Sequence, residues 1–529
     1  MLNPAIRRET YSELRTQLPA QLPAFLLEQR WFGGKARRIV STEIDDIIEV
    51  RSGKLESLVV LVGVKFAEGA VEQYVLPLVP VPAPEVQHVG LTLLKISDAE
   101  SGRSLILGNA LESKAFLETL LPLTSSESVF SGERGELRGH RSAAFAQLYA
   151  GSGEPLKAKL LKGEQSNSSV VYDERLILKF FRRIEEGINP DLEMTAFLTE
   201  RARYRHVPAL AGFLEYRTRN GESSTQAILQ AFVANEGDAW KYTQRSLERF
   251  YEVAKSASRG NTGTANEQVH QVTRETIGAY LKSVALLGRR TAELHLALAS
   301  NSDDPDFAPE PFTVEFQKSF AATLLRMTSD VLRLLRDKIS RLPALWQAKA
   351  EAVAHHEDEI SNRFRASLSE PIKGARLRIH GDFHLGQVLY TGSDFVIIDF
   401  EGEPARPLSE RRIKRSPLQD VAGMLRSFHY AAFAPLLGTS GNEPMDAKRF
   451  EHMRVWAESW TTQVADTFLA EYFQTSGAAP FLPDNPAETS RLLELYVLEK
   501  AIYELGYELN NRPDWVGLPL EGISKLLAI

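Results

Sequence analysis

The stretch that decides the fold is LRIHGDFHLGQVLY (377–390), which continues as TGSDFVIIDFEGE (391–403). Two apolar runs enclose a loop that holds a histidine, an aspartate and a glutamine, and a second aspartate, Asp399, ends the returning run. Polar groups at the ends of apolar strands rarely serve packing, because burying them without partners costs free energy. The stretch therefore predicts a β-rich insert, 377–398, that carries a functional loop.

The spacing of these polar residues suits phosphoryl transfer from a nucleotide. Asp382 can accept the proton of an acceptor hydroxyl. Gln387, five residues later, and Asp399 offer oxygen ligands of the kind that Mg²⁺ prefers. Protein kinases place an aspartate base, an asparagine and a second aspartate in this order, and glutamine keeps the carbonyl ligand while adding a methylene. The sequence thus predicts Asp382 as catalytic base, with Gln387 and Asp399 as metal ligands.

Two other interpretations of the loop are open. His380 and His384 are four residues apart, as in a helical zinc pair, but Gly381 argues against a helix and no third ligand is evident. A His-Gly-Asp triplet alone is also typical of an ordinary turn. We expect His380 to brace the loop backbone instead.

A β-rich region upstream supplies the elements of a nucleotide lobe. Asn220-Gly221 is a hairpin signal between two of its strands. Lys179 interrupts an apolar strand and needs an anionic partner if it is buried. Nucleotide phosphates together with Glu193 would serve, whereas a lysine on an edge strand would simply reach solvent. The expected strands are 156–161, 168–172, 176–181, 213–216 and 226–232.

Two segments of this region are candidates for direct nucleotide contact. The small polar stretch 163–169 links two strands and could present backbone N–H groups and hydroxyls to phosphate, through Ser166, Asn167 and Ser168. The stretch 229–233 lies where the strands give way to helices, the place where a kinase holds adenine, which makes Gln230, Ala231 and Val233 candidates.

The rest of the chain reads as a small α+β domain at the N-terminus and a helical lobe at the C-terminus. Leucines recur every four residues over 10–30, which predicts a helix, and strand-like runs follow at 39–50, 58–66 and 73–80. A helix is also expected over 110–121, and another near 191–204. The later helices are expected at 240–257, 270–300, 311–339, 341–367, 417–435, 446–475 and 487–510.

The composition and the net charge of the chain exclude several classes of function. The chain has 529 residues, 43% of them hydrophobic, and a net charge of −7, which does not favour a nucleic-acid partner. It contains no cysteine, which excludes disulfides, thiolate metal sites and cysteine nucleophiles. The start lacks the apolar stretch of a secretory signal, and no apolar run approaches the roughly 20 residues that span a bilayer. We expect a cytoplasmic protein with no membrane partner.

Several motifs together resemble the bacterial maltokinases, within the aminoglycoside-phosphotransferase-like branch of the kinase superfamily. The glutamine at 387 and the acidic pair in EGE (401–403) are the specific part of this resemblance. The matching motifs are RWFGGK (30–35), SNSS (166–169) with Lys179, HGDFHLGQ (380–387), IDFEGEP (398–404), KRSPLQDVAGM (414–424), and EKAIYE (499–504) with NRPDW (511–515).

The resemblance implies an α+β, bilobal protein-kinase-like fold with an N-terminal cap. The expected parts are a cap domain over 1–100, an intermediate region with the β-rich nucleotide lobe over 101–233, and a helical lobe with the catalytic loop and acceptor site over 234–529. It further implies that ATP, with Mg²⁺, phosphorylates maltose at the anomeric hydroxyl to give maltose 1-phosphate for glycogen-type α-glucan synthesis. Trehalose synthase is an implied partner.

By motif match, Asp382 is the base, Gln387 and Asp399 bind magnesium, and Lys179 with Glu193 positions the phosphates. A stacking ring and hydroxyl partners of the kind that sugars need are also present, although Tyr503 and Tyr507 could instead serve core packing. The predicted sugar-binding residues are His384, Glu401, Glu499, Lys500, Tyr503, Glu504 and Trp515.

Alternatives remain open at this level. The acceptor could be another sugar or amino sugar, such as glucosamine, or an aminoglycoside, which would need a strongly acidic pocket. A catalytically dead scaffold is disfavoured because all of the expected catalytic residues are retained. The basic run 411–415 is either a solvated face or a contact for phosphate or acidic residues, and Asp420 either stabilises a helix start or supports the catalytic loop.

Overall fold

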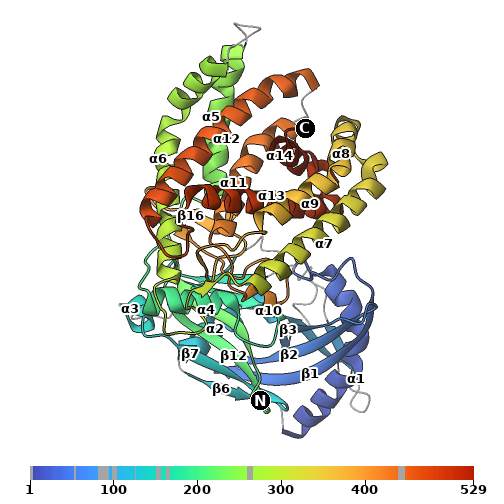
Figure 1. The fold of residues 1–529 in the computed structure, drawn as a ribbon. Helices are drawn as coiled ribbons and strands as arrows, with labels where there is room; N and C mark the ends of the chain where they lie inside the picture. The colour runs from blue at the N-terminus through green and yellow to red at the C-terminus, as the bar shows by residue number, and fades with distance from the viewer. Residues whose placement is uncertain are drawn as a thin grey trace. The chain divides into compact units, whose positions relative to one another are not determined.

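The computed structural model describes two compact units of the chain (Figure 1). The first unit comprises residues 1–201 and 208–234, and the second comprises 202–207 and 235–529. The described residues are 4–52, 55–80, 94–97, 104–125, 127–150, 156–161, 167–258, 266–404, 406–438 and 447–529.

The first unit begins with a helix on an antiparallel sheet, as the leucine spacing predicts. Helix α1 (Pro4–Glu28) buries Leu14, Leu18, Leu22 and Leu26 completely. The expected meander is confirmed, and strands that the sequence analysis did not anticipate extend it. The sheet order is β1 (Ile39–Ser52), β2 (Leu55–Phe66), β3 (Val71–Pro80), β5 (Ser104–Asn109) and β4 (Leu94–Ser97), with β11 (Arg183–Ile184) also paired to β3.

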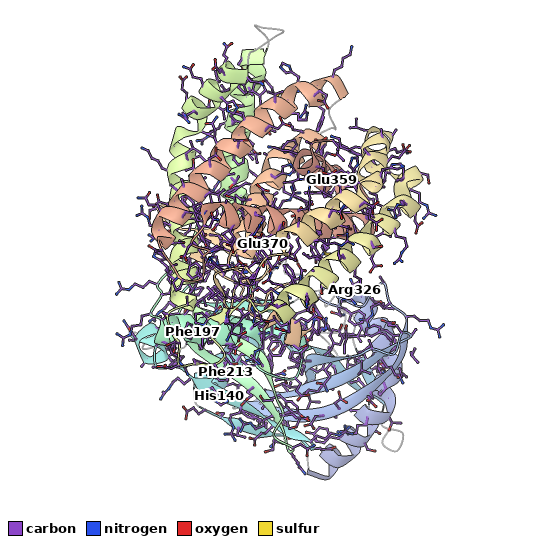
Figure 2. All side chains as sticks on the ribbon, viewed as in Figure 1. His140, Phe197, Phe213, Arg326, Glu359 and Glu370 are labelled. Atoms are coloured by element: carbon purple, nitrogen blue, oxygen red, sulfur yellow. The ribbon has the colours of Figure 1, made fainter. Side chains whose placement is uncertain are left out.

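A second, seven-stranded sheet follows in the same unit. Its order is β6 (Val129–Ser131), β7 (Gly135–Arg141), β12 (Leu210–Thr218), β13 (Ser223–Ala231), β10 (Leu176–Phe181), β9 (Asn167–Tyr172) and β8 (Ala158–Leu160). The hairpin at Asn220-Gly221 is confirmed, while β6 and β7 were not expected. On β7 and β12, the paired residues His140 and Phe213 stack with ring centroids 4.4 Å apart (Figure 2).

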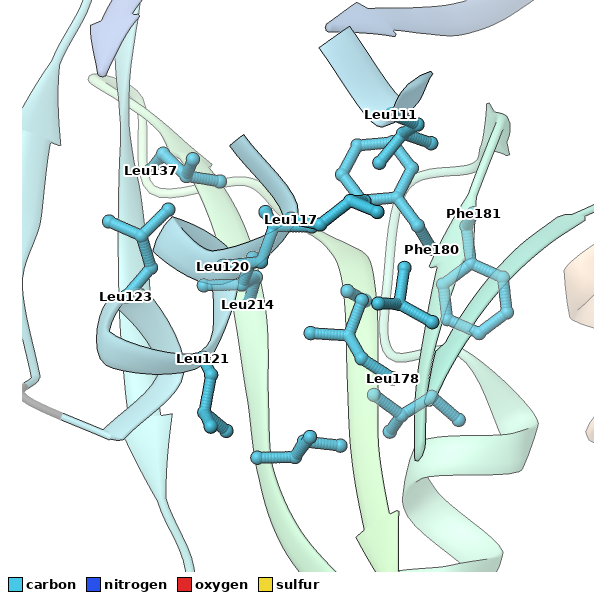
Figure 3. Close-up of a cluster of buried hydrophobic side chains, with 14 of the residues drawn as sticks. Leu111, Leu117, Leu120, Leu121, Leu123, Leu137, Leu178, Phe180, Phe181 and Leu214 are labelled. Atoms are coloured by element: carbon cyan, nitrogen blue, oxygen red, sulfur yellow. The ribbon is translucent and has the colours of Figure 1, made fainter. Parts of the chain in front are cut away.

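The short helices of the first unit cover its core. Helix α2 (Lys114–Ser125), preceded by a 3₁₀ turn at Ala110–Glu112, contributes Leu117, Leu120 and Leu121 to a buried cluster with strand residues such as Leu178 (Figure 3). The remaining helices are α3 (Phe145–Tyr149) and α4 (Pro190–Ala196), and α4 continues as a π-helical turn through Arg201. The predicted helix near 191–204 is therefore confirmed, but it is shorter.

The second unit is mainly helical (Figure 1). The predicted helix over 341–367 is wrong as one element, because the chain breaks at His356 into two helices. The helices are α5 (Ala239–Ser258), α6 (Asn266–Leu298), α7 (Val314–Lys338), α8 (Ala344–His355), α9 (Glu357–Ser367), α10 (Leu408–Arg411), α11 (Leu418–Phe433), α12 (Ala447–Ser476), α13 (Pro486–Asn511) and α14 (Gly517–Leu527).

The β-rich insert differs from the prediction in where its strands lie. Strands β16 (Val388–Tyr390) and β17 (Phe395–Ile397) pair with each other, so both follow the loop instead of flanking it. Before the loop, β15 (Ala375–Arg376) pairs with β14 (Glu310–Pro311), and Leu377 makes a single bridge to Arg415. The expected first strand is short because the next backbone N–H groups bond to a side chain instead of a strand.

Candidate active site

The predicted catalytic loop, residues 380–387 and called the catalytic loop below, is held from its inner side by a buried carboxylate. Asp420, in the first turn of α11, accepts hydrogen bonds from the backbone N–H groups of His380 (2.8 Å) and Gly381 (2.9 Å). Gly381 has a φ of +82°, a conformation that favours glycine. Of the two roles that the sequence left open for Asp420, support of the loop is confirmed, and the residue also lies in the first turn of the helix.

His380 braces the loop as expected. Its Nε2 lies 2.9 Å from the carbonyl oxygen of Ile398 on the returning segment. Its ring also packs against Phe383 and Phe400, with centroids 5.3 and 4.9 Å away. These contacts fasten the loop to the segment that carries Asp399.

The proposed base, Asp382, lies beside a lysine. Lys500 Nζ, from α13, is 3.5 Å from Asp382 Oδ1 and 3.9 Å from Glu403 Oε2. Burial disfavours the Lys500 cation, but the carboxylates of Asp382, Glu403 and Glu504 outweigh burial and raise its pKa. On the other side, His384 Nε2 lies 3.8 Å from Asp382 Oδ2, while its Nδ1 accepts from Gly386 N. A permanent cation therefore adjoins the carboxylate that would receive the acceptor proton.

The backbone brings the two predicted metal ligands close in the structure. Ile398 N donates to Gln387 O at 3.0 Å, so Gln387 lies opposite the residue that precedes Asp399. Asp399 adopts a φ of +67°, unusual for a residue other than glycine, and such strain is typical of functional sites. A carboxylate and an amide carbonyl are oxygen donors that suit magnesium.

A cavity of about 680 Å³ opens beside Asp382, within the size range of ligand pockets. Five of the seven predicted sugar-binding residues line it: His384, Lys500, Tyr503, Glu504 and Trp515. The other lining residues are Asp382, Trp240, Gly386, Glu403, Pro404, Gly423, Ser427, Tyr430, Tyr507, Glu508 and Arg512. The structure thus gathers the catalytic loop and α13 around one space.

Glu401 and Glu499 do not line this cavity. Glu499 is only 7% exposed, and its Oε2 has no hydrogen-bond partner among the described residues. Arg406 Nη2 lies 4.0 Å from Oε1 of the same carboxylate. Contact of Glu401 or Glu499 with a sugar stays a prediction.

Two arginines neutralise the acidic wall of the cavity. Arg426 binds Glu504 Oε2 through two nitrogens at 2.9 and 2.7 Å, and Arg512 binds both oxygens of Glu508 at 2.9 and 2.7 Å. The Tyr430 hydroxyl also donates to Glu508. The wall is therefore polar, but most of its negative charge is paired.

The sequence analysis missed several of these wall residues, although a signal was present. Positions 500, 503, 504, 507 and 508 of α13 recur at helical spacing and form one face. This periodicity could have added Tyr507 and Glu508 to the predicted set. Tyr507 is 45% exposed, so the alternative that it serves core packing is wrong.

In the first unit, Lys179 has an anionic partner that the sequence did not indicate. Its Nζ lies 3.2 Å from Asp191 Oδ2 on α4, and its side chain is 17% exposed. Strand β10 runs between β13 and β9, so the alternative of a lysine on an edge strand is wrong. Pairing of Lys179 with Glu193 stays a prediction.

The other predicted nucleotide contacts are partly engaged within the first unit. Ser168 Oγ accepts from the buried Arg182 at 3.0 Å, and Asn167 begins β9. Gln230 Nε2 donates to Thr195 Oγ1, and the N–H of Ala231 donates to Ala209 O. Val233 follows β13, and Ser166 lies outside the described residues.

The basic run 411–415 contacts acidic residues and is not a solvated face. Lys414, buried, binds Glu310 Oε1 at 2.9 Å and Pro305 O at 2.6 Å. Arg412 lies 3.6 Å from Asp306, and Arg411 donates to the carbonyl of Glu401. Arg411 thus anchors the segment that follows Asp399, while Arg412 and Lys414 contact residues 305–310.

Among the described helices, none is both long and apolar enough to cross a membrane.

Comparisons with known proteins agree with this architecture. Residues 25–106 match the maltokinase N-terminal cap domain. The chain is 23% identical over 367 residues to a glucosamine kinase of Streptacidiphilus jiangxiensis, covering 69% of this chain and 72% of that one. It is 22% identical over 369 residues to a glucosamine kinase of Mycolicibacterium smegmatis, covering 69% and 78%.

Solved structures show the same fold. A glucosamine kinase crystal structure (crystal form B) superposes with a TM-score of 0.64 at 19% identity, covering 97% of this chain and 99% of that one. A glucosamine kinase in complex with glucosamine, ADP and inorganic phosphate gives a TM-score of 0.59 at 18% identity, covering 92% and 94%. The chain therefore combines the maltokinase N-terminal cap domain with the kinase-like fold of these enzymes.

Proposed function

We propose that this protein is an ATP-dependent sugar kinase that phosphorylates maltose at its anomeric hydroxyl, giving maltose 1-phosphate for α-glucan synthesis. The observation that carries the proposal is the cavity in which Asp382 and Lys500 adjoin a wall of aromatic and charge-paired residues. The match to the maltokinase cap domain supports the choice of maltose. Trehalose synthase stays a proposed partner.

In the proposed reaction, Asp382 orients the acceptor hydroxyl and accepts its proton. A bond forms between the acceptor oxygen and the γ-phosphorus, the bond from that phosphorus to the bridging oxygen breaks, and ADP leaves. Magnesium, held by Gln387 and Asp399, would neutralise charge on the phosphates. Lys179 and Glu193 are proposed to position the nucleotide, and Lys500 keeps a positive charge beside the reacting oxygen.

The charge pairing in the cavity favours a neutral acceptor. Glu504 and Glu508 are already paired with Arg426 and Arg512, and Lys500 lies between Asp382 and Glu403. An ammonium-bearing acceptor would compete with these cations, whereas hydroxyls can accept from arginine and donate to carboxylate. Trp515 and Tyr507 add rings on which a sugar can pack.

Glucosamine is the second candidate acceptor, because the named relatives and solved structures above are glucosamine kinases. The test is ATP consumption with Mg²⁺ and, in turn, maltose, glucose, glucosamine and kanamycin. We expect turnover with maltose and a phosphorus NMR signal of a sugar 1-phosphate. Turnover with glucosamine and none with maltose would contradict the proposed acceptor.

The proposed base is tested by Asp382→Asn, which keeps the shape but cannot accept a proton. We expect kcat to fall about 10²- to 10⁴-fold, the usual contribution of general acid–base catalysis. The matched control is Asp484→Asn, because Asp484 is exposed and lies outside the cavity. Full activity in Asp382→Asn would contradict the mechanism, and a wild-type protein inactive with every acceptor would favour a scaffold.

A further inference from the structure

Two carboxylates of the cavity wall are paired with arginines in different ways. Arg512 binds both oxygens of Glu508, with Nε donating to Oε2 and Nη2 to Oε1. Arg426, from α11, instead directs Nε (2.9 Å) and Nη2 (2.7 Å) to one oxygen of Glu504, Oε2. No described residue donates a hydrogen bond to Glu504 Oε1. Because Glu504 lines the cavity and its side chain is 13% exposed, Oε1 is left for a ligand.

A glycine of the C-terminal helix gives Arg426 its place. The Arg426 side chain is 4% exposed, and its guanidinium lies against Gly522, a buried residue of α14. A Cβ atom at position 522 would collide with Nη1 of Arg426 and lie 2.8 Å from Cζ and 2.9 Å from Nη2. The guanidinium is the end of a flexible side chain, so it would give way before the buried helix did. Gly522 therefore provides the space from which Arg426 reaches Glu504.

We infer, on the basis of the proposed function, that Arg426 is a specificity-determining residue that keeps the acceptor site for neutral molecules bearing hydroxyls. Arg426 balances the charge of Glu504, and its attachment to Oε2 alone leaves Oε1 to accept from a hydroxyl. Without Arg426 the carboxylate would face the cavity unpaired. Lys500, the other cation that Glu504 influences, is already shared by Asp382 and Glu403. An unpaired carboxylate favours an ammonium-bearing acceptor over a neutral one.

Stability alone does not account for this pair. Apolar residues of similar volume often stabilise a protein interior as well as a buried ion pair does. A pair kept only for stability gains most from both carboxylate oxygens, as in Arg512 and Glu508, because the arrangement of two parallel hydrogen bonds is the stronger one. The free oxygen of Glu504 and its place on the cavity wall point to selection of the acceptor.

The test compares glucose with glucosamine, which differ only in the hydroxyl or amino group at one carbon, at a pH where the amine is protonated. We expect Arg426→Met to raise the ratio of kcat/KM for glucosamine to that for glucose about tenfold or more, with KM for ATP nearly unchanged. Arg426→Lys, which keeps the charge but not the planar fork, should change the ratio less. Gly522→Ala, which displaces the guanidinium, should change it in the same direction as Arg426→Met. Its matched control is Gly278→Ala in α6, where an added Cβ meets nothing within 4 Å.

A double variant separates the charge from the packing. Arg426→Met combined with Glu504→Gln carries no charge at the pair, so the gain toward glucosamine should disappear, which a merely structural role of Arg426 would not produce. Calorimetric binding of both sugars gives the corresponding ratio without turnover. An unchanged ratio in Arg426→Met, no glucosamine binding by that variant, or a gain that persists in the double variant would overturn the inference. If the wild-type protein phosphorylates none of the sugars, the proposed function fails, while the binding measurements still decide the role of Arg426.

Discussion

His429 is a buried histidine whose protonation state differs between the folded protein and the unfolded chain. Its ring stacks on Phe433 with centroids 4.5 Å apart, deep in α11. Burial, reinforced by the nearby cations Arg426 and Lys525, lowers its pKa well below the ordinary value. His429 is therefore neutral in the folded protein at pH values where it would be protonated in the unfolded chain.

This difference predicts a pH dependence of stability. Below about pH 6.5 the unfolded chain binds a proton at His429 that the folded protein does not, so stability falls with pH by up to about 1.4 kcal/mol per unit from this group. His429→Phe should make the decline from pH 7.5 to 5.5 less steep, as measured by guanidinium unfolding. The exposed His452, changed to Asn, is the control. An equally steep decline in His429→Phe would contradict the assignment.

The polar residues of the catalytic loop could be singled out from the sequence because their spacing is local, and their roles stay predictions. Asp382, Gln387 and Asp399 follow one another at fixed spacing. Lys500 comes from a distant helix, and only the fold brings it beside Asp382. Glu499 shows what the sequence does not reveal. Its position in the motif gives no sign that its side chain is buried and does not line the cavity.

Among the elements, β1 carries two adjacent aspartates with opposite environments. Asp46, fully buried, accepts from the backbone N–H groups of Glu133 and Gly135 and from the hydroxyl of Tyr216, at 2.8 to 2.9 Å. A register irregularity between Ile44 and Asp46 marks this point of the strand, and such bulges redirect side chains. Asp46 thereby ties the first sheet to the β6–β7 turn of the second sheet.

We predict that Asp46→Ala destabilises the first unit by at least about 3 kcal/mol, because it leaves several buried donors without an acceptor. Asp45→Ala is the matched control, since Asp45 Oδ2 accepts a hydrogen bond from Gln73 Nε2 at an exposed position. Its expected effect is within about 0.5 kcal/mol. Hydrogen exchange of β1 distinguishes the two, and equal effects of both variants would contradict the prediction.

The helices with a regular spacing of hydrophobic residues were predicted correctly more often than the other elements. The leucine repeat of α1 and the long amphipathic helices of the second unit were recovered. The break between α8 and α9 was not, because no glycine or proline marks His356. The strand expected before the loop was reduced to a bridge at Leu377, since Asp420 takes the hydrogen bonds that a neighbouring strand would otherwise receive.

At the scale of the whole molecule, the chain passes between the two units three times, at 201–202, 207–208 and 234–235. The segment 202–207 belongs to the second unit although both of its neighbours belong to the first. It is well embedded there: the Tyr204 hydroxyl donates to Arg290 O, and Ile397 N donates to His206 O, both at 2.8 Å. Sequence composition gave no sign of this crossing.

This embedding predicts that the chain can be divided after Ala234. Fragments 1–234 and 235–529, produced together, should co-purify through a tag on one of them, because the first fragment contributes 202–207 to the second unit. Tyr204→Ala should weaken recovery of the divided pair more than it affects the intact chain, since it removes a buried ring worth roughly 1.5–3 kcal/mol. Fragments that purify separately would contradict this prediction.

The support of the catalytic loop from behind has a consequence for how this protein could be altered. Asp420 holds the loop from outside the cavity wall, and of the wall residues Ser427 also accepts from the backbone N–H of Leu385. The wall formed by α13 and the 3₁₀ turn that follows it can be changed at Glu508 or Trp515 without altering the residue that holds the loop. The proposed acceptor site could thus be altered separately from the carboxylate that supports the loop carrying Asp382.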